Sequence, residues 1–101
     1  MLVMPFETPS QIGFTIYSKS NCLFCIKVKQ LLTDNQIFFL EIQSDEYLLE
    51  DKEGFLLFIK DLAKKEYRTF PMVFNNGQFI GGFTDTESFV NKQLCFNDAN
   101  F

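Results

Sequence analysis

The spacing of apolar residues changes along the first half of the chain and predicts a strand, a helix and a second strand. Residues 13–17 combine β-branched and aromatic side chains, which is typical of a strand. After Cys22, apolar residues recur every three or four positions, which predicts a helix that ends at Asp34 and Asn35. Residues 37–42 are almost continuously apolar, so we expect them to form a buried second strand.

A second helix is predicted downstream of an acidic segment. Residues 44–53 carry many carboxylates and are assigned to no element. The helix begins near Phe55 and ends before Arg68. Its apolar face is formed by Phe55, Phe58, Ile59 and Leu62.

A hairpin and a last helix complete the pattern. Residues 72–74 and 78–80 are predicted strands, and the Asn-Asn-Gly sequence at 75–77 is a strong signal for the turn between them. Thr84 and Glu87 have the spacing of a capping box and predict the start of a helix. The order of elements predicts an α/β fold with a four-stranded mixed sheet flanked by about three helices. We expect the first two strands to be parallel and the last two antiparallel.

Composition and charge narrow the function classes. The chain has 101 residues, of which 47% are hydrophobic, and we expect a single domain over residues 1–101. A net charge of −4 without a basic run argues against nucleic acid as a partner. No apolar stretch reaches the length of a membrane span, and residues 1–9 lack a signal-peptide pattern. We therefore expect a protein of the cytoplasm (the host cytoplasm if the source is viral) and a monomer.

The chemistry is predicted to lie in a C-x-x-C pair, Cys22 and Cys25, at the start of the first helix. A free cysteine has a pKa of about 8.5, and the thiolate is the reactive form. Unpaired N–H groups and the positive end of the dipole at a helix N-terminus favour the anion at Cys22, and Lys19 adds positive charge nearby. We expect Cys25, one turn further, to be less exposed and to resolve mixed disulfides formed by Cys22.

Metal-binding and purely structural explanations of the pair are less favourable. A zinc site needs a second pair of ligands, but the chain has no His and only Cys95 remains. A C-x-x-C beside a strand–helix unit in a reducing compartment is typical of a redox motif. We expect no metal ligands, and Cys95 is interpreted as a structural or incidental thiol.

Three motifs resemble the glutaredoxin family, a branch of the thioredoxin-like superfamily. Residues 17–25 (YSKSNCLFC) are similar to the family's active-site segment, 68–71 (RTFP) to its Thr-Val-Pro loop, and 79–85 (FIGGFTD) to its Gly-Gly turn and following Asp. The motifs occur in the family's order, and the resemblance runs from about residue 12 to 90.

The resemblance implies a thioredoxin-like fold and a glutathione site. In it, Pro71 would be a cis-proline, the backbone of Phe70 would pair with the cysteinyl unit of glutathione, and Lys19 and Arg68 would face the glycyl carboxylate. The γ-glutamyl end would meet Thr84 and Asp85. The full implied set is Lys19, Phe24, Arg68, Thr69, Phe70, Pro71, Gly82, Phe83, Thr84 and Asp85.

The sequence departs from the commonest family pattern at four positions. Leu23 and Phe24 replace the usual Pro and Tyr between the cysteines, Tyr67 stands where Gln is frequent, and Phe70 replaces Val. The loss of Pro frees one backbone N–H at the start of the helix. It also keeps open an iron–sulfur cluster held by Cys22 and glutathione between two subunits.

The resemblance implies an enzyme that uses glutathione to reduce protein disulfides and protein–glutathione mixed disulfides, with no other cofactor. Its partners would be glutathione and disulfide-containing or glutathionylated proteins, with ribonucleotide reductase as one candidate. Three alternatives stay open: a thioredoxin-like electron donor to ribonucleotide reductase, an iron–sulfur carrier or sensor, and a non-catalytic binding module.

Overall fold

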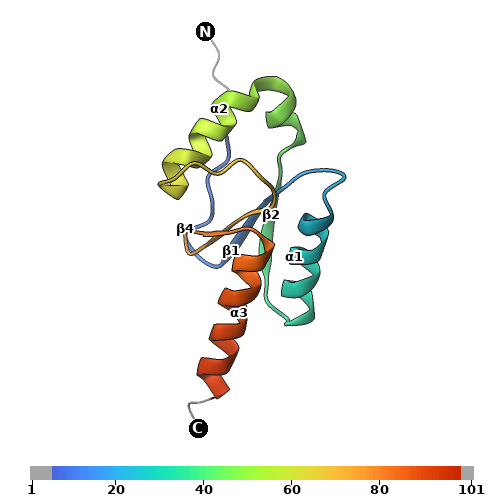
Figure 1. Cartoon of the computed structure of the whole chain (residues 1–101), viewed down its shortest axis with the longest axis vertical. Coiled ribbons are helices and arrows are strands. Elements are labelled where there is room, and N and C mark those ends of the chain that lie inside the picture. Colours follow the sequence, from blue (N-terminus) through green and yellow to red (C-terminus); the bar gives the residue numbers. More distant parts are fainter. Residues whose placement is uncertain (1–5, 99–101) are drawn as a thin grey trace.

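The four strands form one mixed sheet in the order β2-β1-β3-β4 (Figure 1). A computed structural model describes residues 6–98 of the chain, with side chains through residue 93. The strands are β1 (Phe14–Ser18), β2 (Phe39–Gln43), β3 (Met72–Asn75) and β4 (Gln78–Gly81). β1 runs parallel to β2, and β3 runs antiparallel to both β1 and β4. The expected pairing directions are confirmed, and so is the α/β fold class.

Three helices cover the two faces of the sheet. They are α1 (Leu23–Asp34), α2 (Asp45–Ala63) and α3 (Phe83–Asp98). In Figure 1, α1 and α3 lie next to one another, whereas α2 packs apart from them. Side chains along a strand alternate between faces, so β1 directs Phe14 and Ile16 toward α1 and α3 and directs Tyr17 toward α2.

The two resulting cores differ in composition. The core beneath α1 and α3 is mainly aliphatic and contains Ile16, Val28, Leu32, Val73 and Val90, with Phe14 at its margin. The core beneath α2 is built largely from aromatic rings, and its buried members are Tyr17, Ile42, Phe55, Leu56, Ile59, Met72 and Phe74. The predicted apolar face of the second helix is therefore the face that meets the sheet.

The acidic segment left unassigned by the sequence is helical. α2 begins at Asp45, about ten residues earlier than its apolar pattern indicates, and it contains a kink at Asp51 (φ −159°, ψ 71°). The Asp51 carboxylate accepts a hydrogen bond from the N–H of Gly54 at 3.1 Å. Asp51 thus caps the second half of α2, and the kink interrupts the apolar periodicity by which the whole helix could have been recognised.

The prediction of a buried strand over residues 37–42 is wrong in its start and in its burial. The strand begins at Phe39, and β2 lies at the edge of the sheet. Ile42 is buried under α2, whereas Leu40 on the same face is 45% exposed. The core beneath α2 includes only Ile42 from this strand, so part of an apolar run remains in contact with solvent.

The predicted cap of the last helix is also wrong, because the helix starts two residues earlier than a cap at Thr84 requires. α3 starts at Phe83, and the Asp85 carboxylate accepts a hydrogen bond from the N–H of Gly82 at 3.3 Å. The Thr86 hydroxyl donates to the carbonyl of Gly82 at 2.8 Å. Asp85, three residues after Gly82, therefore supplies the reciprocal contact that the sequence assigned to Glu87.

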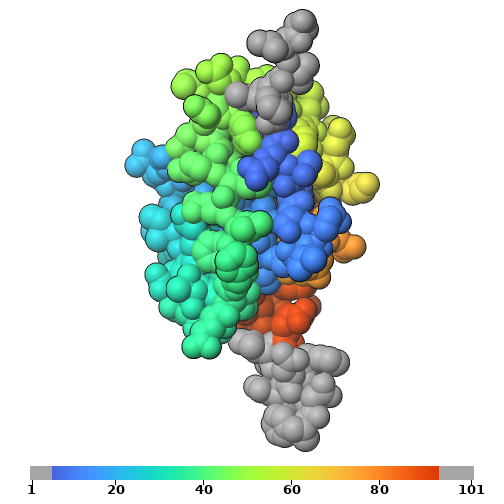
Figure 2. All heavy atoms as spheres, turned by 180° about the vertical axis from the view of Figure 1, so that it is seen from behind, coloured from blue at the N-terminus to red at the C-terminus, as the bar shows by residue number. Residues whose placement is uncertain are grey.

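The segment before β1 packs against the α2 face. The ring of Phe6 contacts those of Tyr47, Phe55 and Phe58 at centroid distances of 5.1–5.5 Å. Figure 2 shows this segment, in blue, beside the green residues of α2. The buried Tyr17 hydroxyl donates to the carbonyl of Glu7 at 2.5 Å, and burial raises the pKa of Tyr17 well above its usual value.

In the part of the chain that is described, no helix is long and apolar enough to cross a membrane.

Candidate active site

Cys22 and Cys25 form a disulfide where β1 leads into α1. Cys22 is the N-cap residue of α1, with extended backbone angles (φ −127°, ψ 103°), and its Cα lies 5.3 Å from that of Cys25. Cys22 is partly exposed, whereas Cys25 is only 1% exposed. The two cysteines therefore differ as the sequence predicted: the first can be reached by another molecule and the second lies behind it.

The first turn of α1 directs a hydrogen-bond donor at the sulfur of Cys22. The N–H of Cys25 points at Cys22 Sγ with an N···S distance of 3.2 Å. A backbone N–H at a helix start, aligned with the positive end of the dipole, stabilises an anion. After reduction the same donor is in place to stabilise the Cys22 thiolate.

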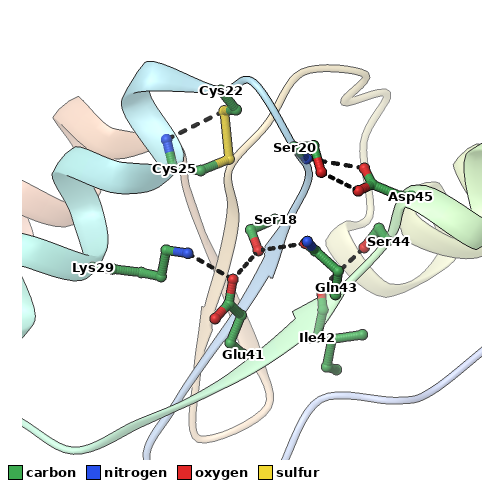
Figure 3. A network of polar contacts seen from close by, with 10 residues as sticks. All are labelled: Ser18, Ser20, Cys22, Cys25, Lys29, Glu41, Ile42, Gln43, Ser44 and Asp45. Carbon is green, nitrogen blue, oxygen red and sulfur yellow. Dashed lines mark hydrogen bonds and ion pairs between the residues drawn. A yellow bond between two sulfur atoms is a disulfide. The ribbon is translucent and has the colours of Figure 1, made fainter.

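A polar network lies next to the cysteine pair, at the carboxyl end of β1 (Figure 3). The hydroxyl of Ser18, which is buried, donates to the Glu41 carboxylate at 2.5 Å, and Lys29 Nζ donates to the same carboxylate at 2.7 Å. The hydrogen bond from Lys29, followed by that from Ser18, lowers the pKa of Glu41. The network joins α1 to both strands beneath it and so fixes the helix that carries the cysteines.

A second polar contact holds the loop before Cys22. The backbone N–H of Ser20 donates to the Asp45 carboxylate at 2.9 Å, and the Ser20 hydroxyl donates to the same group. These hydrogen bonds lower the pKa of Asp45, with a smaller contribution from the charge of Lys19. The start of α2 therefore anchors the active-site loop, which gives a role to part of the acidic segment.

An open groove of about 420 Å³ lies between the start of α1, the loop before β3 and the start of α3. Its lining residues are Phe24, Tyr67, Thr69, Phe70, Pro71, Gly82, Phe83, Thr84 and Asp85. All the residues of the implied glutathione site are here except Lys19 and Arg68. The groove reaches α1 at Phe24, two residues after Cys22. The Phe70–Pro71 peptide bond is cis, as the resemblance implied.

Two aromatic rings line the groove between α1 and α3, and a lysine lies beside them. The rings of Phe24 and Phe83 stack with centroids 5.9 Å apart. Lys27 Nζ lies 5.4 Å from the Phe24 centroid and 5.8 Å from that of Phe83. The sequence analysis did not single out Lys27. Its spacing of three residues from Phe24 on a helix is the signal that places the two side chains together.

Tyr67 is a groove residue that the sequence analysis named only as a departure from the family pattern. Its ring packs edge-on against Phe79, with centroids 4.8 Å apart. A methyl group added at Gly82 would lie 2.7 Å from the Tyr67 hydroxyl oxygen. Glycine is therefore required at position 82 while Tyr67 keeps this position.

The two cations expected to face the ligand lie outside the groove lining. Arg68 donates to the carboxylates of Glu66 and Glu53 at 3.2 Å and 3.1 Å. The hydrogen bond to Glu66, followed by that to Glu53, raises the pKa of Arg68. Lys19 lies near Asp45. Asp85 is the charged side chain in the lining itself.

Among the side chains that the structure describes, residues 6–93, no group of three or more His, Cys, Asp or Glu is placed to hold a metal ion. The side chain of Cys95 lies outside the described residues, so its interpretation as a structural or incidental thiol stays a prediction.

The chain is similar to known glutaredoxins over most of its length. A family model for glutaredoxin matches residues 14–80. The mitochondrial glutaredoxin-2 of Homo sapiens is 36% identical over 80 residues, which are 79% of this chain and 46% of that protein. Glutaredoxin-C6 of Oryza sativa subsp. japonica is 35% identical over 86 residues, 85% of this chain and 73% of that protein. The chain spans about half the length of the first curated relatives it matches.

Solved structures of glutaredoxins have a similar fold. Glutaredoxin 1 from Francisella tularensis, complexed with cacodylate, superposes with a TM-score of 0.70 at 28% identity, covering 80% of this chain and 94% of that one. A buckwheat glutaredoxin–glutathione complex gives a TM-score of 0.66 at 25% identity, covering 82% and 73% of the two chains. With its thioredoxin-like sheet, its Cys22–Cys25 pair and these relatives, the chain belongs to the glutaredoxin family.

Proposed function

We propose that the protein is a glutathione-dependent thiol–disulfide oxidoreductase that reduces protein disulfides and protein–glutathione mixed disulfides. The observation that carries the proposal is the asymmetric cysteine pair beside a groove. Cys22 is partly exposed and meets the N–H of Cys25, while Cys25 is buried behind it. The neighbouring buckwheat glutaredoxin–glutathione complex supports glutathione as the ligand.

In the monothiol route, the Cys22 thiolate attacks the glutathione sulfur of a mixed disulfide. A disulfide forms between Cys22 and glutathione, the original S–S bond breaks, and the substrate thiolate leaves with the electron pair and takes a proton from solvent. The thiolate of a second glutathione then attacks the glutathione sulfur on Cys22. Glutathione disulfide leaves and the Cys22 thiolate is regenerated.

In the dithiol route, Cys22 attacks a protein disulfide and forms a mixed disulfide with the substrate. Cys25 then attacks Cys22 Sγ, which forms the intramolecular disulfide seen here and releases the reduced substrate. Two glutathione molecules reduce the Cys22–Cys25 disulfide and become glutathione disulfide. Electrons therefore flow from glutathione through the cysteine pair to the substrate.

The groove supplies groups that suit glutathione. The N-terminus of α3 presents backbone N–H groups for the γ-glutamyl carboxylate, and the Asp85 carboxylate suits the ammonium group. We assign the glycyl carboxylate to Lys19 and Arg68. Arg68 must then turn away from Glu53 and Glu66, which costs little because these ion pairs are exposed to solvent.

We propose that glutathione is the only small molecule the reaction needs, that the protein acts as a monomer in the cytoplasm, and that its partners are disulfide-containing or glutathionylated proteins. Ribonucleotide reductase is one candidate. An iron–sulfur cluster would need ligands in addition to Cys22, because Cys25 is buried. Purified protein that is brown and dimeric would favour that alternative.

The test is glutathione-dependent reduction of the mixed disulfide of glutathione and 2-mercaptoethanol, coupled to NADPH through glutathione reductase. We expect the wild type to be active, Cys22→Ser to be inactive and Cys25→Ser to keep substantial activity through the monothiol route. A wild type that is inactive with glutathione but active with thioredoxin reductase would replace this proposal with the thioredoxin-like alternative.

A further inference from the structure

We propose that the segment before β1 holds the active-site loop in place through the start of α2, with Tyr47 as the positioning residue. We call residues 6–10 the strap and residues 19–21 the active-site loop. The first half of α2 is residues 45–50, which precede the kink. The inference deepens the proposed function and rests on it, since it concerns the loop that leads to the attacking thiolate.

The strap is fastened to the first half of α2 at Tyr47. The backbone N–H of Glu7 donates to Tyr47 Oη at 3.0 Å, and the ring of Phe6 meets the ring of Tyr47 edge-on, with centroids 5.1 Å apart. The carbonyl of the same Glu7 accepts a hydrogen bond from the buried Tyr17 hydroxyl at 2.5 Å. Because Tyr17 belongs to β1, the backbone of Glu7 links the sheet to the first half of α2.

The opposite side of the first half of α2 holds the active-site loop. The N–H of Ser20 donates to the Asp45 carboxylate at 2.9 Å, and the Ser20 hydroxyl donates to the same group (Figure 3). Residues two apart in an α-helix point about 200° apart, so Asp45 and Tyr47 lie on opposite sides of this turn. The first half of α2 is therefore placed between the strap and the active-site loop.

The kink makes the first half of α2 depend on these contacts. Asp51 leaves helical geometry (φ −159°, ψ 71°), and the hydroxyl of the N-cap residue Ser44 donates to the carbonyl of Ile42 at 3.1 Å rather than to the helix. A helical segment this short is not stable by itself, so tertiary contacts must hold it. The ring of Tyr47 on Phe55 is one such contact, and the hydrogen bond from the strap is another.

The active-site loop needs a contact of this kind. Asn21 lies between Ser20 and Cys22 and has a φ of 54°, a region that residues other than glycine seldom adopt. Such a conformation persists only where the surrounding structure holds it, and Asp45 supplies that support at Ser20. If the strap is released, we expect the reduced loop to move. Cys22 then leaves the geometry in which the N–H of Cys25 meets its sulfur.

The experiment removes one hydrogen bond from either side. Tyr47→Phe deletes the acceptor and keeps the ring, whereas Glu7→Pro deletes the donor because proline has no N–H. In prereduced protein, each variant is expected to raise the rate at which the Ser20 amide exchanges with water, measured by NMR, by about fivefold. The double variant should show no further increase. Glu7→Ala keeps the N–H and is the matched control, with exchange expected to equal that of the wild type.

The second readout is the reactivity of Cys22. Alkylation of Cys22 by iodoacetamide at pH 7, located by mass spectrometry, is expected to slow by about threefold in Tyr47→Phe, because less of the thiol is ionised. Ile59→Val shortens a fully buried side chain in the second half of α2 and destabilises the fold. It should change neither the alkylation rate nor the exchange of the Ser20 amide.

The outcomes separate the strap from general stability and from glutathione chemistry. Unchanged Ser20 exchange in Tyr47→Phe overturns the proposal, and this variant decides the test if Glu7→Pro does not fold. An equal rise at the amides of Ser20 and Ile59 also overturns it, because the fold as a whole would then be less stable. So does faster Ser20 exchange without slower alkylation. Both readouts work without glutathione, so their success in a protein that lacks glutathione turnover would overturn the proposed function alone.

Discussion

The two faces of the sheet differ in what they contribute: one holds most of the aromatic packing, and the other is covered by the helix that carries the reactive cysteines. The α2 face is filled with aromatic rings, and Phe55 lies at the centre of them with no exposed surface. The face beneath α1 and α3 has a smaller, aliphatic core, and the helices that cover it begin at the cysteines and at one side of the groove. The largest buried side chains therefore lie on the face opposite the reactive cysteines.

The loop before β3 is where the two faces meet. Phe70 lines the groove and also stacks on Phe55, with centroids 6.2 Å apart and the rings inclined by 5°. Tyr67 likewise lines the groove while packing on Phe79. Substitutions on one face, on the other and in this loop should therefore have separable effects.

The largest effect is expected from Cys22→Ser. Replacement of the thiolate by a hydroxyl should reduce glutathione-dependent kcat/KM by at least about 10⁴-fold, equivalent to about 5.5 kcal/mol. The unfolding free energy of the reduced protein should stay within about 0.5 kcal/mol of wild type, because serine is a preferred N-cap residue at the start of α1. Urea unfolding in excess reductant checks the second value. A large loss of unfolding free energy together with the loss of activity would show that Cys22 also stabilises the fold, and that stability and chemistry are not separated between the two faces.

Phe55→Ala is expected to show the reverse pattern. Removal of a fully buried ring that contacts five others should lower the unfolding free energy by about 3–5 kcal/mol. Phe55→Leu keeps most of the volume and should cost less than about 1.5 kcal/mol, with activity close to wild type. Urea denaturation and the coupled assay measure both. Inactive, fully folded Phe55→Leu protein would mean that the aromatic core controls the groove directly.

The sequence could predict the aliphatic face more completely than the aromatic one. The apolar residues that recur every three or four positions after Cys22 predicted α1, and two of them, Val28 and Leu32, are buried in it. The first half of α2 was missed because Asp51 leaves helical geometry and shifts the apolar period, a local event that periodicity does not register. The burial of β2 was overestimated because its edge position depends on the order of strands in space.

The groove, too, could be predicted only in part from the sequence. The motifs named most of its lining, because each motif lies at the end of an element that the fold brings to one edge. Tyr67 joined it only through packing against Phe79, which comes from β4. Arg68 is adjacent in sequence but reaches Glu53 of α2, a contact across fifteen residues that no local pattern contains.

A smaller effect is expected where the two faces meet, at Gly82. In Gly82→Ala the new methyl group would lie 2.7 Å from the Tyr67 hydroxyl oxygen, so Tyr67 must move within the groove. We expect the KM for the glutathione mixed disulfide to rise about fivefold, near 1 kcal/mol, with kcat less affected. The double variant Gly82→Ala/Tyr67→Phe removes the opposing oxygen and should recover most of the loss. Steady-state kinetics on the three proteins measure both effects. A double variant no better than the single variant would show that the Tyr67 hydroxyl is not the cause.

The smallest effect concerns Glu41, the polar stabilising contact on the face that carries the chemistry. Its carboxyl pKa is lowered in the folded protein, first by the hydrogen bond from Lys29. A lowered folded pKa means that the ion pair stabilises the fold above the unfolded value of about 4.3, and that this contribution is lost as the pH falls through the folded pKa. Glu41→Gln should therefore be less stable than wild type at pH 7, by less than about 1 kcal/mol because the pair is partly exposed.

The difference between wild type and Glu41→Gln should shrink as the pH falls below about 5 and passes through the lowered folded pKa of Glu41, because protonation makes that side chain neutral as well. Thermal unfolding across this range measures it, with Glu50→Gln, an exposed carboxylate of α2, as the control for a general change in charge. A difference that stays constant with pH would assign the effect to the geometry of the hydrogen bond from Ser18 rather than to the charge of Glu41. Either way, the result tells how much of the stability of the α1 face comes from the polar network beside the cysteines and how much from its aliphatic core.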